Sequence, residues 1–128
     1  MTLDVSAMTG PKWTHRFIIA VNPIVERSSF LFYGASFATL LELPETPDHS
    51  VPMVAQLPMR YVPVFTKGCI SSMLSGVAVR MQGAVEREDG GQELYRAAFI
   101  RLSLDANRQQ HFALGAFNCR RADGAPER

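Results

Sequence analysis

Short apolar runs separated by turn residues mark the first part of the chain. Residues 14–21 are rich in β-forming side chains, and the Asn22-Pro23 pair directly after them breaks regular structure. A second apolar run covers residues 29–33 and leads into Gly34. This pattern predicts β-structure on both sides of the Asn22-Pro23 turn.

The apolar period changes after Gly34. Phe37, Leu40 and Leu41 follow helical spacing, and Ser36 could cap the start of that helix. Residues 44–50 (PETPDHS) have the composition of a loop, and the two prolines in them limit the helix. The sequence therefore predicts one short helix.

From residue 53 onward the apolar positions follow a period of two, which is typical of an extended segment. The positions on its shared face are Met53, Ala55, Leu57, Met59, Tyr61 and Phe65. Pro58 and Pro63 interrupt backbone hydrogen bonding, so we expect an edge, a bulge or a bend there. Lys67-Gly68 predicts the turn that follows.

The last third of the sequence predicts strands joined by tight turns. Residues 88–91 (EDGG) are a strong hairpin signal between an alternating stretch that ends at residue 86 and a return strand over 94–104. One face of the return strand carries Ala98, Ile100, Leu102 and Leu104. A final strand is predicted over 111–121.

The order of these segments predicts an α+β fold, in which a curved antiparallel sheet of five to six strands wraps around one short helix. One helix is buried in this way only if the sheet curls around it, and the other sheet face and the edges then need a partner. The length of 128 residues suits a single domain. We expect a flexible lead-in at 1–12, the domain at 13–121 and a disordered tail at 122–128.

Composition narrows the class of protein. The chain is 47% hydrophobic and carries a formal net charge of +1, so no overall charge favours nucleic acid or an anionic membrane. No apolar stretch is long enough for a membrane helix, and the N-terminus lacks a signal-peptide pattern, which favours the cytoplasm. Cys69 and Cys119 are expected to be reduced, packed thiols. The three histidines have no neighbours at metal-ligand spacing, so no metal site is expected. No other cofactor is expected either.

Three segments resemble one known family in their order and spacing. Residues 33–42 (YGASFATLLE) resemble a His-Gly-Gly segment followed by a helix with a leucine and an acidic residue. Residues 59–64 with Lys67-Gly68 resemble a strand and turn of that family, and residues 112–117 (FALGAF) resemble its last strand. The family is that of the hot-dog thioesterases, especially the phenylacetate-type and putative-thioesterase subgroups. The resemblance covers roughly residues 24–121.

This resemblance implies a hot-dog fold and a function in hydrolysing or binding an acyl thioester of coenzyme A or of acyl carrier protein. Glu42 would be the base or nucleophile, and the Gly34 and Ala35 amides would stabilise the oxyanion. Tyr33, which stands where the family has histidine, could donate a hydrogen bond. Candidate substrate contacts are Thr39, Arg27, Tyr61 and His49. The family also implies a homodimer or a dimer of dimers.

Other interpretations remain open from the residues alone. Glu42 could be a solvated residue near a helix end, Gly34 could serve only a tight entry into the helix, and Tyr33 could be a half-buried aromatic residue. Because the family histidine and second glycine are replaced, a non-catalytic module that binds a ligand or a partner is the main alternative. A small nucleic-acid-binding barrel is a third hypothesis, in which Tyr61, Phe65 and Tyr95 would stack bases beside Arg60, Arg80 and Arg96.

Overall fold

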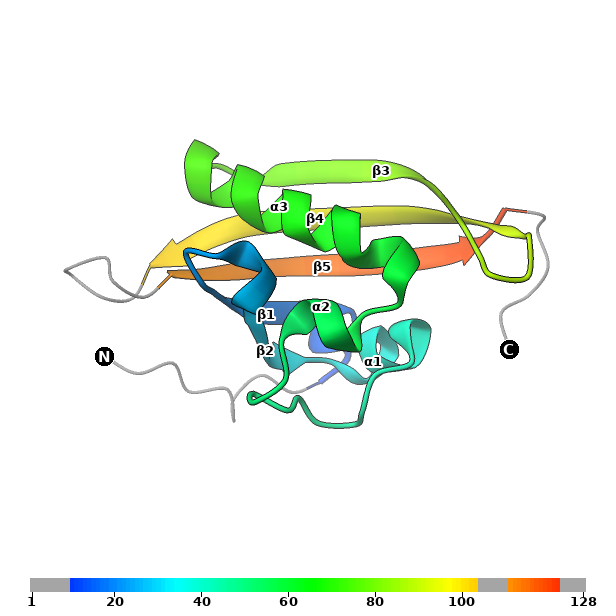
Figure 1. The fold of residues 1–128 in the computed structure, drawn as a ribbon, viewed down its shortest axis with the longest axis horizontal. Coiled ribbons are helices and arrows are strands. Elements are labelled where there is room, and N and C mark those ends of the chain that lie inside the picture. Colours follow the sequence, from blue (N-terminus) through cyan, green and yellow to red (C-terminus); the bar gives the residue numbers. More distant parts are fainter. Residues whose placement is uncertain (1–9, 104–110, 123–128) are drawn as a thin grey trace.

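A five-stranded antiparallel sheet forms the framework of the molecule (Figure 1). The computed structural model describes residues 10–103 and 111–122. The strands are β1 (Arg16–Val21), β2 (Ser29–Tyr33), β3 (Val79–Glu86), β4 (Gln92–Ser103) and β5 (His111–Arg121). Their order across the sheet is β2-β1-β5-β4-β3, so the first hairpin pairs with the last strand. The expected lead-in and tail fall largely outside the described residues, as does Leu104.

The helices are short except for one. They are α1 (Ala35–Leu41), α2 (Met53–Gln56) and α3 (Val62–Ser75), with 3-10 turns at Pro11–Trp13, Val25–Arg27 and Met59–Tyr61. All three α-helices follow β2 and precede β3, and they pack on one face of the sheet (Figure 1). We call the face that they cover the inner face and the opposite face the outer face.

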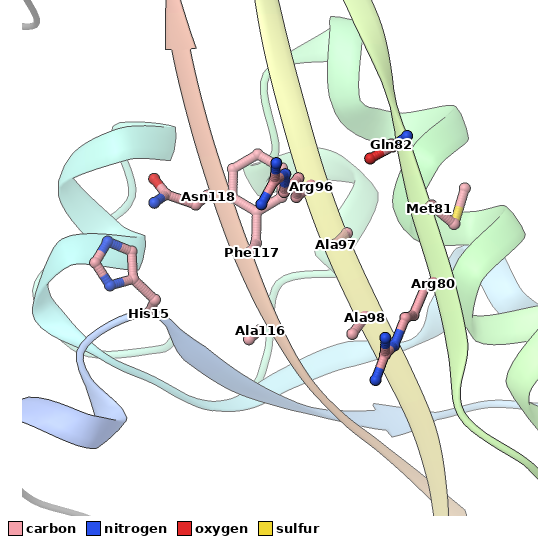
Figure 2. Close-up of a pocket in the computed structure, with 10 residues that line it drawn as sticks. All are labelled: His15, Arg80, Met81, Gln82, Arg96, Ala97, Ala98, Ala116, Phe117 and Asn118. Carbon is pink, nitrogen blue, oxygen red and sulfur yellow. The ribbon is translucent and has the colours of Figure 1, made fainter.

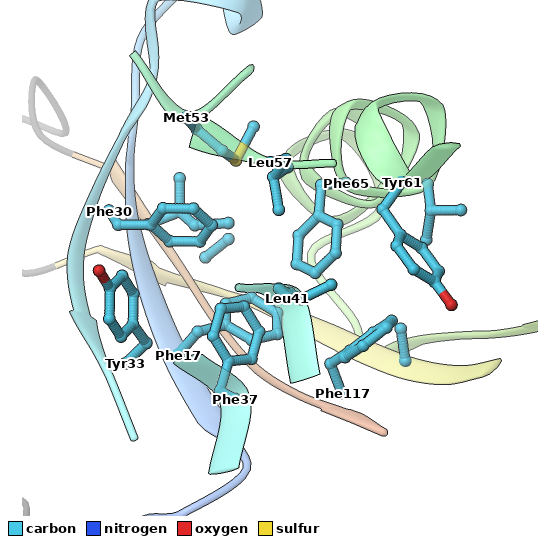
Figure 3. Close-up of a cluster of buried hydrophobic side chains, with 14 of the residues drawn as sticks. Phe17, Phe30, Tyr33, Phe37, Leu41, Met53, Leu57, Tyr61, Phe65 and Phe117 are labelled. Atoms are coloured by element: carbon cyan, nitrogen blue, oxygen red, sulfur yellow. The ribbon is translucent and has the colours of Figure 1, made fainter. Parts of the chain in front are cut away.

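Aromatic side chains fill the space between the helices and the inner face (Figure 3). Phe17 and Phe117 from the sheet meet Phe37 from α1 and Phe65 from α3, with ring centroids 5.2 to 6.0 Å apart. Each of these four rings is at most 1% exposed. Burial of such rings removes 150–250 Å² of surface each, so this cluster supplies much of the apolar driving force for folding.

The largest error of the sequence prediction lies between residues 53 and 75. The predicted extended segment is instead α2, a 3-10 turn and the 14-residue helix α3. Met53, Leu57, Tyr61 and Phe65 are four residues apart, and this spacing satisfies both a period of two and the helical period of 3.6. Pro63 lies in the first turn of α3, where a missing amide costs nothing and the fixed φ favours the helix.

The predicted hot-dog arrangement is wrong as well. The fold is α+β with five antiparallel strands, but no sheet wraps around a single central helix; three helices cover one face. In β4 the alternation of side chains was predicted correctly. The buried face, however, is the one with Ala97 and Phe99, whereas Ile100 on the apolar face that the sequence predicted is 41% exposed. The hairpin at residues 88–91 and the strand at 111–121 are confirmed. Cys69 and Cys119 are both buried thiols.

Candidate functional site

The outer face of β3, β4 and β5 has an unusual composition for an exposed surface. Its central residues are Arg80, Gln82 and Ala84 on β3, Leu94, Arg96 and Ala98 on β4, and Ala116, Asn118 and Arg120 on β5. They reach this face because side chains alternate along each strand, so that Met81, Ala97 and Phe117 between them point into the core. On the outer face, polar and basic side chains therefore lie beside small or apolar ones.

Two adjoining hollows lie on this face, each with a volume of about 740 Å³. They share Gln82, Arg96 and Asn118, which are cross-strand neighbours in one row of the sheet. Figure 2 shows the guanidinium of Arg96 on β4, which lies between β5 and β3, with Asn118 on one side of it and Gln82 on the other. The alanines at positions 98 and 116 leave space beside that row. Both hollows are open, so they suit an extended or flat binding partner more than a fully enclosed small molecule.

Three arginines cross this face on a diagonal. Arg80 lies opposite Ala98, Arg96 lies between Gln82 and Asn118, and Arg120 lies opposite Leu94. From Arg80 to Arg96, and again from Arg96 to Arg120, the position moves to the neighbouring strand and shifts by two residues along the strand direction. From the spacing of strands and residues, successive Cα atoms on the diagonal are roughly 8 Å apart. We call this set the arginine diagonal.

The charge of the diagonal is not compensated locally. All three side chains are exposed, and within residues 10–103 and 111–122 none of them forms a hydrogen bond or an ion pair. Among the described outer-face residues of these three strands, Glu86 is the only acidic one, at the far end of β3. A chain whose formal net charge is only +1 can therefore present a positive surface here.

A second polar cluster lies on the inner side of the sheet, at the hairpin end. Glu93 of β4 is 2% exposed, and it accepts a hydrogen bond of 2.6 Å from the Tyr61 hydroxyl. Arg60 donates to the same carboxylate through Nε at 3.3 Å, and Arg87 of the hairpin donates to its other oxygen. Arg60 also lies over the Tyr61 ring at 5.3 Å.

The electrostatics of this cluster keep Glu93 ionised. Burial alone would raise its pKa, but the hydrogen bonds from Tyr61 and Arg60 and the nearby positive charges hold the pKa below its ordinary value. Burial and the bond to Glu93 raise the pKa of Tyr61, so its phenol stays protonated and donating. Every oxygen of Glu93 has a partner, which describes a structural clamp and not a group free to act on a substrate.

Comparisons with known proteins identify the fold. No protein-family model matches the sequence, and no relative is found among curated proteins. Among solved structures, a light-oxygen-voltage domain studied with a flavin analogue aligns over 88% of this chain and 82% of its own, at 13% identity and a TM-score of 0.51. The chain has a PAS/LOV-type fold. A fungal light-oxygen-voltage photoreceptor domain aligns over 92% of this chain and 82% of its own, at 11% identity and a TM-score of 0.48.

This PAS/LOV-type fold overturns the expected family. The resemblance to hot-dog thioesterases is wrong, and with it the acyl-thioester hydrolase and the acyl-CoA or acyl-carrier-protein partner. The homodimer and the dimer of dimers rested on the same resemblance and are withdrawn with it. The hot-dog motifs were short glycine-and-apolar patterns, and such patterns mark a turn into a helix or a buried strand in many folds.

The N-terminus of α1 is not an open oxyanion site. The Ser36 amide donates to the Thr14 hydroxyl at 3.0 Å, and the Phe37 amide donates to the Thr14 carbonyl at 2.9 Å. Gly34 donates to the Arg16 carbonyl, and a Cβ at Gly34 would lie 2.2 Å from the Trp13 carbonyl oxygen. The glycine therefore serves the close approach of two backbone segments, and Thr14 takes the capping role that the sequence suggested for Ser36.

The remaining predicted site residues do not converge. Glu42 is exposed at the C-terminal end of α1 in the left-handed region, with φ 56°. Tyr33 donates through its hydroxyl to the Pro44 carbonyl at 2.7 Å, and Tyr61 is buried against Glu93. The exposed His49 contacts the Leu31 carbonyl, and Arg27 is exposed beside α2 and α3.

Only Ala35 and Thr39 share a hollow. It has a volume of about 280 Å³ and also involves His15, Ser36 and Leu40. The Thr39 hydroxyl itself donates to the Ala35 carbonyl. The nucleic-acid hypothesis fails on burial, because Tyr61 and Phe65 are both 0% exposed and cannot stack on bases. In the described residues no His, Cys, Asp and Glu side chains group as metal ligands, and no helix is long and apolar enough to cross a membrane.

Sequence reasoning named Arg80 and Arg96 only as basic residues of the nucleic-acid hypothesis and did not predict a binding face on the sheet. Arg80, Gln82 and Arg96 were visible as the polar half of two alternating strands, which is the ordinary pattern of a solvated face. The register that aligns them with Asn118 and Arg120 depends on pairing across three strands. The missing signal was that acidic residues are nearly absent from the polar positions of these strands.

Proposed function

We propose that this chain is a non-catalytic sensory or signalling module of PAS/LOV type, and that it binds its ligand or partner on the outer face of its sheet. The observation that carries the proposal is the contrast between the two sides of the sheet. The two hollows of about 740 Å³ lie on the outer face, while the inner face is filled by packed aromatic rings. A module with this distribution would receive and pass on a signal through surface contacts.

The interior supports this proposal because it does not fit a flavin. The solved neighbour was studied with a flavin analogue, and a flat, three-ring group of that kind would enter this interior only through a slot between the helices and the sheet. Here that space contains rings in direct contact, including Phe37 with Phe117 at 6.0 Å and Phe65 with Phe117 at 5.5 Å between centroids. The only buried, unsatisfied side-chain atom of the described residues is Oε1 of Gln56, and one acceptor is too few for the polar edge of such a group.

The thiol that α3 contributes to this core would not anchor a ligand either. Cys69 of α3 is 0% exposed, and burial raises its pKa to about 12. Since the thiolate is the nucleophilic form, the side chain stays a protonated, apolar part of the core at neutral pH. The interior thus serves as a structural core, and a ligand or partner would bind on the surface.

The proposal is tested by mapping where ligands bind. Amide spectra of ¹⁵N-labelled protein would be recorded with a fragment library, with flavin mononucleotide and with acyl-CoA. We expect shifts at Gln82, Arg96 and Asn118 and none for flavin mononucleotide at interior residues such as Phe37 or Phe117. Stable yellow protein with shifts at those interior residues would overturn the proposal, and so would release of free thiol from acyl-CoA.

A further inference from the structure

We propose that the outer face binds an acidic segment of a partner protein, whose carboxylates pair with the arginine diagonal. This inference rests on the function proposed above and adds the chemistry of the partner. It goes beyond the fold, because a sheet face of this kind could as well be apolar or of mixed charge. The residues that carry it are Arg80, Arg96 and Arg120 with their neighbours Gln82 and Asn118.

The first argument is charge. Three exposed guanidinium groups within a small area repel one another, and among the described residues no acidic side chain pairs with any of them. Three other arginines of this molecule show how such groups can be satisfied within the chain. Arg60 and Arg87 bind Glu93, and Arg16 lies over the Trp13 ring at 4.8 Å. A carboxylate offers the planar, two-oxygen acceptor that suits a guanidinium group.

The second argument is shape. Ala98 and Ala116 occupy the row beside Arg96, and Ala84 lies in the row on its other side. These small side chains leave the two hollows of about 740 Å³ between the arginines, so a backbone can approach the sheet there. The roughly 8 Å steps of the diagonal are close to the spacing of alternate residues in an extended chain, which is about 6.7 Å. Gln82 and Asn118 can bond backbone amides or carbonyls of such a segment.

The same features disfavour other occupants. If two copies met symmetrically through this region, the arginine diagonals would face each other, and juxtaposed like charges disfavour such an interface. A single-stranded nucleic acid needs exposed aromatic rings for stacking. On the described outer-face positions of β3, β4 and β5 the only aromatic residue is Phe112, which is 9% exposed.

The experiment uses a fluorescein-labelled 16-residue peptide of alternating Glu and Ala, and the same peptide with Lys for Glu. Fluorescence anisotropy would measure binding to the whole chain at low and physiological salt. We expect the acidic peptide to bind, the basic peptide not to bind, and the affinity to fall as salt screens the charges. Arg96→Gln should weaken the acidic peptide roughly tenfold, which corresponds to the loss of one charge pair.

Arg27→Gln is the matched control, because it removes one exposed guanidinium on the helical side of the sheet and should change the affinity less than about twofold. Equal binding of both peptides, or equal effects of Arg96→Gln and Arg27→Gln, would overturn the acidic partner. Tighter binding of a 16-nucleotide single strand than of the peptide would overturn it in favour of nucleic acid. In each case fragment shifts at Gln82 and Asn118 would show that the outer-face function itself still stands, and their absence would show that it does not.

Discussion

The hydroxyl of Tyr61 donates a hydrogen bond of 2.6 Å to the carboxylate of Glu93, and this contact joins the helical layer to the sheet. Tyr61 ends the 3-10 turn that runs into α3, whereas Glu93 lies near the start of β4. Arg87 in the β3–β4 hairpin binds the same carboxylate. One buried charge thus holds together the start of the longest helix and the hairpin at the edge of the sheet.

The first prediction concerns the strength of this contact. Tyr61→Phe removes one hydrogen bond to a buried charge while keeping the ring that packs on Phe117 at 5.0 Å. We expect a loss of about 2 kcal/mol in the free energy of unfolding, as is usual for a hydrogen bond to a charged group. Urea denaturation followed by circular dichroism measures it.

Tyr33→Phe is the matched control for that change. It removes a part-buried hydrogen bond to the neutral carbonyl of Pro44, an exposed residue, so its cost should be about 1 kcal/mol or less. Equal costs for the two variants would mean that the charge of Glu93 adds nothing to the contact.

The second prediction concerns pH. The pKa of Glu93 lies below its ordinary value of 4.5 in the folded protein, so the folded state binds fewer protons than the unfolded state near that pH. Its contribution to stability is then fully present above pH 4.5 and is lost as the pH falls through the lowered pKa. In Glu93→Gln, which cannot ionise, we expect a loss of about 3 kcal/mol at pH 7, because the buried Arg60 then keeps only the 3.9 Å contact with the exposed Glu88 as a counter-charge.

The measurement is urea unfolding of the wild type and Glu93→Gln at a series of pH values from 7 to about 3. The difference between the two proteins should stay constant down to the ordinary pKa and shrink below it. A difference that is unchanged at the lowest pH would refute an ionised Glu93 with a depressed pKa.

How far the sequence predicts the fold depends on whether a segment's period is unambiguous. Phe37, Leu40 and Leu41 fit a helix and not a period of two, and residues 88–91 fit only a turn, so α1 and the hairpin were predicted correctly. Met53, Leu57, Tyr61 and Phe65 fit a strand and a helix equally well. The choice between them is made by tertiary packing, because α2, the 3-10 turn and α3 together bring all four side chains into one core. Local patterns do not contain that information.

The candidate site escaped prediction for a related reason. Arg80, Arg96 and Arg120 are 16 and 24 residues apart in sequence and come together only through the register of three strands. Glu42 and Gly34 looked catalytic because a glycine before a helix and an acidic residue after it form a short, recognisable pattern. In the structure, Gly34 is a site of close backbone approach and Glu42 ends α1.

The third prediction tests the contact between α3 and the sheet. A Cβ at Gly68 would lie 2.2 Å from Cε1 of Phe99, whose ring is 1% exposed and has no room to move. Helix propensity alone would make Gly68→Ala stabilising by up to about 1 kcal/mol. We expect the clash to dominate instead and to destabilise the protein by about 2 kcal/mol.

Phe99→Leu in the same chain should relieve that clash. The double variant is expected to be more stable than the sum of the single changes predicts, by about 1 kcal/mol, because the two residues are in contact. Additive effects in urea denaturation, or a Gly68→Ala variant that is more stable than the wild type, would show that α3 does not pack on Phe99 through this glycine.

The fourth prediction concerns Glu42, which ends α1 at φ 56°. The left-handed region costs a side-chain-bearing residue roughly 1–2 kcal/mol, and a negative charge at a helix C-terminus is also unfavourable. Glu42→Gly removes both penalties at the expense of a more flexible unfolded chain, so we expect a net gain of about 0.5–1 kcal/mol. Glu42→Asn should gain less, since asparagine tolerates this conformation but still carries a Cβ. Thermal unfolding would show Tm rising in the order wild type, Asn, Gly. A fall in Tm for both variants would mean that the Glu42 side chain stabilises the end of α1 through contacts of its own.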